Sequence, residues 1–347
     1  MPNAFAAYLA EHHTDLDGYL ASFFGEERTG CPAGDDLDRF LYAPLRAFSE
    51  NGGKRHRPLI CLIACRAVGG DPARARSCAA AIEHFQSAAL IHDDIADEGE
   101  LRRGEPCLHR AEGTGLAINA GDLALTQVFE VVLRDEALPA DRRLRALSEL
   151  VRMERHTLEG QALDLGWVRD ARWDVTSEDY LYMVTSKTSW YSAAVPLYVG
   201  ALVGGGSEEA ARGLLEVGLT AGVAFQLADD LLNLVGDAEA QGKDFRSDIT
   251  EGKRTLAAVW ALEHLDDVGR EELVALLGSS TTDAAALARA VELIDRGGGI
   301  EHCRTLAGQM AERAKEGARE LAEAGHITVE ARDLLLSMSD FFVERAS

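Results

Sequence analysis

Apolar residues recur three or four positions apart along most of the chain, which is the spacing of one face of an α-helix. We find no convincing stretch in which apolar and polar residues alternate, as they would in a half-buried strand. The pattern therefore predicts an all-α fold. Two clear examples of the helical spacing are the sets Leu144, Leu147, Leu150, Val151, Leu158 and Leu214, Leu215, Leu219, Val223, Leu227.

The predicted helices cover most of the sequence and are separated by short breaks. Glycine triplets at 204–206 and 297–299 mark two of the breaks, and Pro72 and Pro139 stand where helices can begin. The expected helices span residues 4–24, 38–49, 54–68, 72–98, 115–137, 139–166, 176–188, 189–203, 207–236, 253–265, 269–278, 281–296, 300–324 and 328–345.

Some of these helices are apolar on nearly every side, for example residues 79–91 with the sequence AAAIEHFQSAALI. A helix of this kind belongs at the centre of a large helical bundle. No Pro-rich, Ser-rich or Gly-rich tract is long enough to serve as a linker. We therefore expect residues 1–347 to form a single domain.

Composition narrows the possible partners and the compartment. Acidic residues outnumber basic ones by 58 to 35, a net charge of −23, which argues against a nucleic-acid-binding protein. The first twenty residues lack the basic and apolar regions of a leader, and nowhere do about eighteen uncharged apolar residues run together. We expect a cytoplasmic protein without stable membrane insertion. The six cysteines form no Cys-x-x-Cys pair and are interpreted as structural thiols.

Three aspartates close the apolar helix at residues 79–91. Asp93 and Asp97 are four positions apart and share a helix face, and Asp94 lies next to the first of them. Carboxylates that emerge from an apolar stretch are costly without a nearby cation. Their oxygens suit Mg²⁺, which shares its remaining positions with water and phosphate.

A similar set of oxygen-bearing side chains occurs about 136 positions later. Asp229, Asp230 and Asn233 repeat the spacing, and Gln226 lies one turn earlier on the same face. Two such sets that face each other across a cavity would hold two or three magnesium ions. For either set alone, the alternative is a solvated helix end.

Basic residues stand beside glycine turns and beside the acidic sets. Lysine offers phosphate a point charge and arginine a bidentate fork, so these residues indicate anion pockets next to metal pockets. Each motif alone is equally consistent with a surface loop or a salt-bridge partner. The basic candidates are Lys54, Arg57, Arg102, Arg103, Lys187, Lys243 and Lys253.

The motifs occur along residues 52–255 in the order GGKRHRP, LIHDDIADEGELRRGEP, AINAGD, GQALD, SKT, FQLADDLLN and KDFRSDITEGKRT. This ordered set resembles the trans-isoprenyl diphosphate synthases, or polyprenyl synthetase family, and geranylgeranyl diphosphate synthases most of all. The resemblance implies an all-α bundle around a central cavity. It also implies an enzyme that joins isopentenyl diphosphate to an allylic diphosphate with Mg²⁺, through three ions when substrate is bound, and that forms a homodimer.

The resemblance assigns roles residue by residue. The implied metal ligands are Asp93, Asp94, Asp97, Asp229, Asp230 and Asn233. Residues implied to neutralise the allylic diphosphate are Arg102, Lys187 and Lys243, with Lys253 as a further substrate-binding cation. Those implied to bind isopentenyl diphosphate are Lys54, Arg57, Gln86 and Arg103, while Thr188 and Gln226 line the developing allylic cation. Asn233 departs from the family's third aspartate, and its amide removes one negative charge.

Product length is expected to depend on residues one and two turns before Asp93. Farnesyl-making relatives carry aromatic rings where this chain has Ala88 and Ala89, so there is room for a longer product here. Phe85 is expected to close the pocket, which gives geranylgeranyl diphosphate as the expected product and a longer or shorter polyprenyl chain as the alternative. Core packing is the other interpretation of all three residues.

Two further functions remain open. A class I terpene cyclase also ionises a diphosphate beside an Asp-rich helix, but it lacks the GGKR and RRG segments for a second diphosphate. A non-catalytic synthase subunit keeps the bundle and loses aspartates, whereas this chain retains five of the six motif carboxylates.

Overall fold

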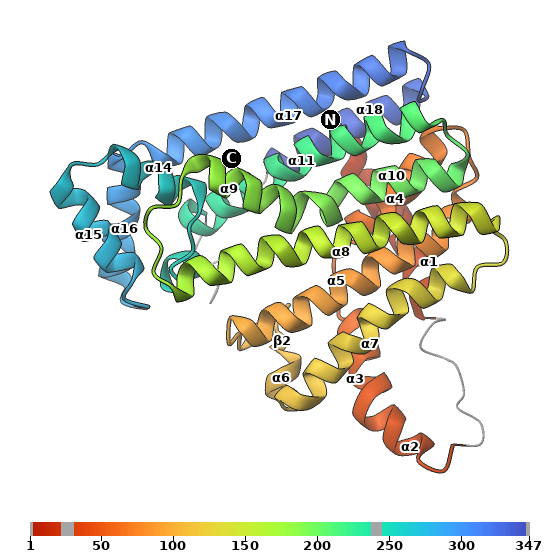
Figure 1. The fold of residues 1–347 in the computed structure, drawn as a ribbon, viewed down its shortest axis with the longest axis horizontal. Coiled ribbons are helices and arrows are strands. Elements are labelled where there is room, and N and C mark those ends of the chain that lie inside the picture. The colour runs from red at the N-terminus through yellow and green to blue at the C-terminus, as the bar shows by residue number, and fades with distance from the viewer. Residues whose placement is uncertain (1–2, 22–30, 237–244, 345–347) are drawn as a thin grey trace. The chain divides into compact units, whose positions relative to one another are not determined.

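The computed structural model describes residues 3–21, 31–236 and 245–344. Most of these residues are helical, so the predicted all-α fold is confirmed (Figure 1). Their contacts divide the chain into two compact units. The single domain stays a prediction. The first unit is Met1–Arg152, Val195–Arg212 and His326–Ala331, and the second is Met153–Ala194, Gly213–Gly325 and Arg332–Ser347.

The first unit contains most of the N-terminal helices and a small hairpin. Its elements are α1 (Ala4–Ala21), α2 (Gly34–Leu37), η2 (Asp38–Tyr42), α3 (Ala43–Glu50), α4 (His56–Ala67), η3 (Pro72–Ala75), α5 (Arg76–Ala96), β1 (Leu101–Arg102), β2 (Glu105–Pro106), α6 (Leu108–Ala111), α7 (Thr114–Leu133) and α10 (Val195–Gly204). The long helices α8 (Ala140–Arg169) and α11 (Glu208–Val235) contribute residues to both units.

Small side chains allow the central helices of the first unit to pack closely. Helices α5 and α7 lie side by side and run in opposite directions (Figure 1), and Ala88 and Ile91 of α5 share a buried cluster with α7. Helix α10 packs on α4, where a Cβ atom on Gly200 would lie 2.1 Å from the Cys61 carbonyl oxygen. Glycine is therefore required at position 200 for this approach.

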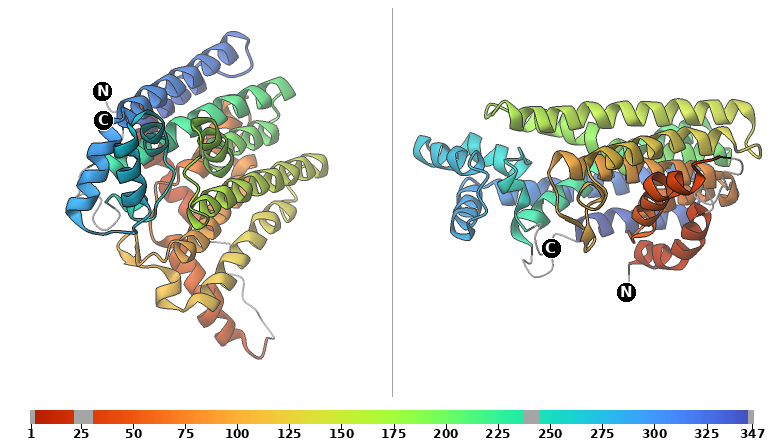
Figure 2. Two further views of the ribbon diagram at one scale, coloured as in Figure 1. Left: turned by 60° about the vertical axis from the view of Figure 1, so that its left-hand side comes forward. Right: turned by 90° about the horizontal axis from the view of Figure 1, so that it is seen from below.

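The second unit has its own apolar core. Leu227 and Leu231 of α11 are buried in a cluster with residues of α14, α16 and α17. Figure 2 shows α14, α15 and α16, coloured teal to blue, grouped together. The remaining elements of this unit are α9 (Ser177–Val184), η4 (Thr185–Ala194), α13 (Ser247–Thr250), α14 (Leu256–His264), α15 (Asp267–Leu277), α16 (Ala284–Arg296), α17 (Gly299–Glu323) and most of α18 (Val329–Val343), whose first turn belongs to the first unit.

The predicted helix boundaries agree with the structure at several capping residues. Pro72 opens η3, and the Asp71 side chain accepts from the Ala73 amide at 3.0 Å. The glycine breaks near 204–206 and 297–299 also fall between helices. The predicted break between residues 188 and 189 is wrong, because α9, η4 and α10 are continuous and η4 is a ten-residue π-helix. Such widened turns are frequent at functional sites.

The β1–β2 hairpin was not anticipated from the sequence. Its two-residue turn places Arg103 at φ 54° and Gly104 at φ 84°, as a type I′ turn requires. The strands are only two residues long, too short for apolar alternation to be seen.

Candidate functional site

The first acidic set lies where α5 ends. Asp94 is buried, whereas Asp93 and Asp97 are partly exposed. Asp97 is the C-cap, with its amide donating to the Asp93 carbonyl at 2.8 Å. The helix therefore stops where the three carboxylates leave the apolar core of the first unit.

The hairpin after α5 returns Arg102 to this set. Arg102 Nε donates to both carboxylate oxygens of Asp94 at 2.7 and 2.8 Å, and Nη2 donates at 2.5 Å. Burial lowers the pKa of Arg102, but the hydrogen bonds and charge of Asp94 outweigh it and raise that pKa. Asp94 thus forms an ion pair with the Arg102 guanidinium group, and its role as a metal ligand stays a prediction.

Guanidinium groups gather beside this hairpin. Burial lowers the pKa of Arg103, Glu83 opposes that effect, and the positive charges of Arg55, Arg102 and Arg57 lower the pKa further. Repulsion among these cations would be relieved by a bound anion. The predicted candidates Arg57, Arg102 and Arg103 are therefore brought together in one electropositive region.

The glycine turn before α4 is shaped to receive Arg103. The Arg103 guanidinium donates to the carbonyls of Asn51 at 3.0 Å and Gly52 at 2.5 Å. A Cβ atom on Gly53 would lie 2.9 Å from Arg103 Nη2, so a larger residue would displace that side chain. Lys54 follows Gly53 directly in the chain, which places this predicted cation at the same turn.

Two other residues of the predicted isopentenyl diphosphate pocket are buried. Arg57 is 9% exposed and donates from Nη1 to His56 Nε2 at 3.1 Å. Gln86 is 8% exposed, and within the described residues its Oε1 atom is buried without a hydrogen-bond partner. This oxygen is a hydrogen-bond acceptor and needs a donor, so a diphosphate would bind to the Gln86 amide through its Nε2 donor and not through Oε1.

In the second unit, the π-helix η4 carries Lys187 and Thr188. Lys187 Nζ donates to Asp164 Oδ2 at 2.6 Å, and Lys253 Nζ lies 3.5 Å from the same oxygen. Burial raises the pKa of Asp164, but the charges of Lys187 and Lys253 outweigh it and hold that pKa below its usual value. Asp164 therefore forms ion pairs with two predicted substrate-binding lysines. The sequence did not reveal that Asp164 orients them.

A glycine on α8 makes the Lys187 position possible. A Cβ atom on Gly160 would lie 2.3 Å from the Lys187 backbone nitrogen. The backbone of η4 therefore contacts α8 directly at this point, one helical turn before Asp164.

A chain of hydrogen bonds joins η4 to the second acidic set. Thr188 Oγ1 donates to Gln226 Oε1 at 2.9 Å, and Gln226 Nε2 donates to Asp230 Oδ1 at 2.8 Å. The buried Tyr180 hydroxyl donates to the other Asp230 oxygen at 2.6 Å. The orientation of the Gln226 amide is thus fixed by a threonine on one side and a carboxylate on the other.

The second acidic set holds more negative charge than its surroundings favour. Burial is the main cause that raises the pKa of Asp230 to about 7, and the charges of Asp229 and Asp164 add to it. The pKa of Asp248 is also raised, by burial and then by the charge of Asp230. Asp248 is a member of this set that we did not single out from the sequence, although it lies within the KDFRSD motif.

Asn233 connects α11 to the segment that carries Asp248. Its Nδ2 donates to Ser247 Oγ at 3.1 Å, and its Oδ1 accepts from the Asp248 amide at 3.2 Å. The Asn233 amide thus donates through its nitrogen and accepts through its oxygen. An ionised aspartate at this position would lack the donor. The predicted metal contact of Asn233 stays a prediction, and Lys243 lies outside the described residues.

The chemistry of the acidic sets fits Mg²⁺. Asp229 is exposed and Asp230 and Asp248 have raised pKa values, so a divalent ion would relieve their repulsion. Among the described residues, no group of three or more His, Cys, Asp or Glu side chains is arranged to hold a metal ion. The predicted metal ligands therefore stay a prediction.

The residues expected to control product length differ in their surroundings. Ala88 is fully buried in the cluster between α5 and α7, which favours core packing for this side chain. Ala89 is partly exposed, and Phe85 is 2% exposed. Of the two alanines, Ala89 remains the better candidate for contact with a growing chain.

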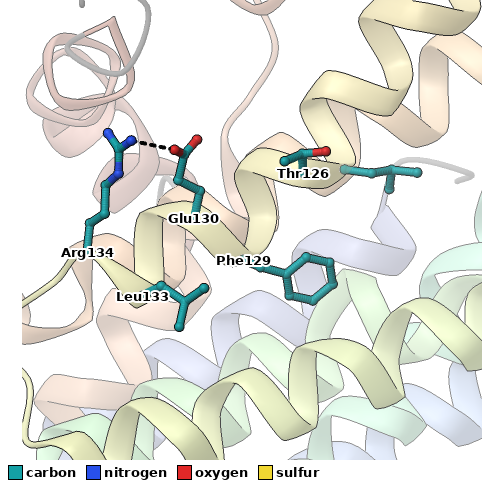
Figure 3. Close-up of a pocket in the computed structure, with 6 residues that line it drawn as sticks. Thr126, Phe129, Glu130, Leu133 and Arg134 are labelled. Atoms are coloured by element: carbon teal, nitrogen blue, oxygen red, sulfur yellow. Dashed lines mark ion pairs between the residues drawn. The ribbon is translucent and has the colours of Figure 1, made fainter.

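An apolar groove of about 560 Å³ lies along α7. Figure 3 shows Phe129 and Leu133 on this groove and an ion pair between Glu130 and Arg134 at its edge. None of the predicted site residues lines it. It begins one turn after Asp122, which lies 3.5 Å from His92, the residue before Asp93. Because α5 and α7 run in opposite directions, the groove extends away from the acidic set.

Among the described helices, α7 is long and apolar enough to cross a membrane by length and composition. Its most apolar window is 44% buried. Core helices of folded proteins meet the same criterion, so one such helix is weak evidence for a membrane span.

Comparison with known proteins adds three findings. A sequence model described as polyprenyl synthetase matches residues 38–294. A short chain isoprenyl diphosphate synthase of Methanothermobacter thermautotrophicus is 41% identical over 85% of this chain and 87% of its own, and a geranylfarnesyl diphosphate synthase of Natronomonas pharaonis is 38% identical over 88% and 90%. A crystal structure of geranylgeranyl pyrophosphate synthase from Corynebacterium glutamicum, complexed with isoprenyl diphosphate and magnesium, superposes with a TM-score of 0.83 at 29% identity over 99% of both chains.

Proposed function

Because the chain belongs to the polyprenyl synthetase family and is an isoprenyl diphosphate synthase, we propose that it makes geranylgeranyl diphosphate in a magnesium-dependent reaction. The reaction joins isopentenyl diphosphate head to tail to an allylic diphosphate. The observation that carries the proposal is the hydrogen-bonded chain from Thr188 through Gln226 to Asp230, which connects the π-helix bearing Lys187 to an acidic set.

Ionisation of the allylic substrate places negative charge on the departing diphosphate. Bound Mg²⁺, held by the aspartates of both acidic sets, would supply Lewis-acid stabilisation of that charge. Lys187 and Arg102 are oriented by Asp164 and Asp94, so their positive charge is already in place when the bond breaks. Preorganised charge of this kind lowers the barrier without a change of structure during the reaction.

The residues around the allylic carbon stabilise the cation and exclude competing reactions. Gln226 Oε1 and Thr188 Oγ1 present oxygen atoms with partial negative charge, held in place by their mutual hydrogen bond. The double bond of isopentenyl diphosphate attacks the cation, and the released pyrophosphate takes the proton whose loss restores an alkene. Arg57, Arg103 and Lys54 hold the second diphosphate for that attack.

Two observations support a product of twenty carbons. Ala89 places no large ring in the first turn below Asp93, and Phe85 is a bulky side chain one turn further down α5. A twenty-five-carbon product is the second candidate, because one of the relatives is named a geranylfarnesyl diphosphate synthase.

We also propose that the enzyme is a cytoplasmic homodimer. Helix α8 exposes four aliphatic side chains at intervals of seven residues, a spacing that places them along one side of the helix. Exposed apolar surface of this extent is typical of an interface. Charged substitution of Leu144 and Leu158 is expected to shift the sedimentation coefficient to that of a monomer. The four residues are Leu144, Val151, Leu158 and Leu165.

The test of the proposed reaction is product analysis. Purified protein is incubated with Mg²⁺, isopentenyl diphosphate and either dimethylallyl, geranyl or farnesyl diphosphate, and the dephosphorylated alcohols are sized by chromatography. We expect geranylgeraniol. A hydrocarbon formed from geranylgeranyl diphosphate alone would indicate a terpene cyclase, and no condensation with any primer would indicate a non-catalytic subunit.

A further inference from the structure

One face of α1 contacts the turn that carries Lys54. His13 Nε2 lies 2.7 Å from the Gly53 carbonyl oxygen, and Asp17 Oδ1 accepts from Arg55 Nε at 2.8 Å. His13 and Asp17 are one helical turn apart and share a face of α1. Gly53 and Arg55 are the residues immediately before and after Lys54. Helix α1 thus holds both neighbours of this lysine.

The two contacts belong to one network. His13 Nδ1 lies 2.8 Å from Asp17 Oδ2, so Asp17 uses one oxygen for the histidine and the other for Arg55. Arg55 is buried and also donates to Glu83 and to the Ser49 carbonyl, the latter at 2.5 Å. Charge-assisted hydrogen bonds to a buried guanidinium are strong and directional. Arg55 therefore fixes the distance between α1 and the interior of the first unit.

The turn itself has a backbone that requires support. Gly52 and Gly53 have φ angles of 70° and 117°, and Arg55 has a φ of 47° in the left-handed region. That region is unfavourable for a residue with a side chain, so contacts must maintain it. Arg103 binds the carbonyls of Asn51 and Gly52, and His13 binds the carbonyl that follows.

We propose that His13 and Asp17 are positioning residues for isopentenyl diphosphate, which clamp the turn so that Lys54 is directed at that diphosphate. This inference rests on the proposed function, because Lys54 is a substrate contact only in that reaction. His13 and Asp17 do not themselves touch the substrate. The clamp acts on one substrate, so it affects isopentenyl diphosphate and leaves the allylic diphosphate unaffected.

Substitution of Asp17 tests the clamp, with a matched control on the same helix. Asp17→Asn removes the charge from both contacts, and Asp15→Asn removes the same charge from an exposed position. We expect Asp17→Asn to raise KM for isopentenyl diphosphate about 5- to 10-fold, with kcat and KM for farnesyl diphosphate within about twofold of wild type. Asp15→Asn should leave all three unchanged. An unchanged KM in Asp17→Asn, or an equal rise for both substrates, would overturn the proposal.

Two substitutions of His13 separate its contacts. Glutamine places an N–H donor near the position of Nε2 and preserves the bond to Gly53, whereas asparagine places one near Nδ1 and loses that bond. The clamp predicts a higher KM for isopentenyl diphosphate in His13→Asn than in His13→Gln. Equal values would show that the contact to Gly53 does not position Lys54.

A double substitution shows whether the clamp acts through Lys54. In a Lys54→Ala background, Asp17→Asn should have no further effect on KM for isopentenyl diphosphate, since the positioned group is gone. Additive effects would overturn the proposal. Calorimetric titration with isopentenyl diphosphate alone measures the same clamp without turnover. If wild type binds isopentenyl diphosphate but forms no product, the proposed function fails, while a weaker binding by Asp17→Asn still supports the clamp.

Discussion

Asp164→Asn is expected to destabilise the protein and to slow turnover, because it removes the negative charge that two lysines share. The Asp164 side chain is 5% exposed, and those of Lys187 and Lys253 are 24% and 14% exposed. The substitution retains the shape of the side chain and leaves two partly buried ammonium groups close together. Removal of one partner from a buried ion pair costs about 3 to 5 kcal/mol, and partial exposure of the lysines reduces this to about 2 to 3 kcal/mol.

The prediction is measured by urea denaturation and by steady-state kinetics. At neutral pH the unfolding midpoint of Asp164→Asn should be lower than that of wild type, and kcat should fall about tenfold or more because Lys187 is no longer oriented. The folded-state pKa of Asp164 is lowered, so its stabilisation is present above the usual carboxylate pKa and is lost as pH falls through the folded value. The two proteins should therefore converge in acid.

Asp170→Asn is the matched control, since Asp170 follows the same helix and is exposed. It should have the wild-type midpoint and rate. If Asp164→Asn also matched wild type at neutral pH, the ion pairs to Lys187 and Lys253 would contribute neither stability nor orientation, and the reasoning would be refuted.

Three further substitutions test other parts of the account. Burial raises the pKa of Glu154 from 4.5 to about 7, so the free energy of unfolding should fall as pH rises between these two values. Glu154→Gln should abolish this fall and add about 1 kcal/mol at pH 8 in urea titrations. Parallel pH curves for the two proteins would contradict this. Gly160→Ala places a methyl group 2.3 Å from the Lys187 backbone nitrogen, and a loss of about 1 to 3 kcal/mol is expected in thermal unfolding, whereas an unchanged Tm would show that the approach is not tight. Phe85→Ala should lengthen the product by one or more five-carbon units, and chromatography that shows the same alcohol as wild type would exclude Phe85 as the end of the pocket.

Most of the fold could be predicted from the sequence because helical periodicity and glycine breaks are local signals. The helices around Asp93 and Asp229 lie where the pattern placed them. The π-helix η4 could not be predicted, because π-helices are rare and apolar spacing indicates a helix without distinguishing its widened turns. The hairpin that returns Arg102 to Asp94 was likewise too short to show alternation.

The candidate site was only partly visible in the sequence, because several of its partners are distant along the chain. Asp164 lies within the GQALD motif, but its role depends on lysines 23 and 89 positions away, which the motif alone does not indicate. The basic run at residues 54–57 gave no indication that Arg55 turns inward to Glu83 while its neighbours remain candidates for substrate. The direction in which each of these side chains points depends on tertiary packing and not on residue type.

The central proposal is that Asp93 and Asp229 are both required for Mg²⁺-dependent binding of the allylic diphosphate. It is tested most directly by calorimetric titration with the thiolo analogue of farnesyl diphosphate, in which sulfur replaces the bridging oxygen, for wild type, Asp93→Ala and Asp229→Ala. We predict binding that requires Mg²⁺ and that weakens at least about tenfold in each variant. Wild-type affinity in either variant, or equal binding without Mg²⁺, would contradict the account.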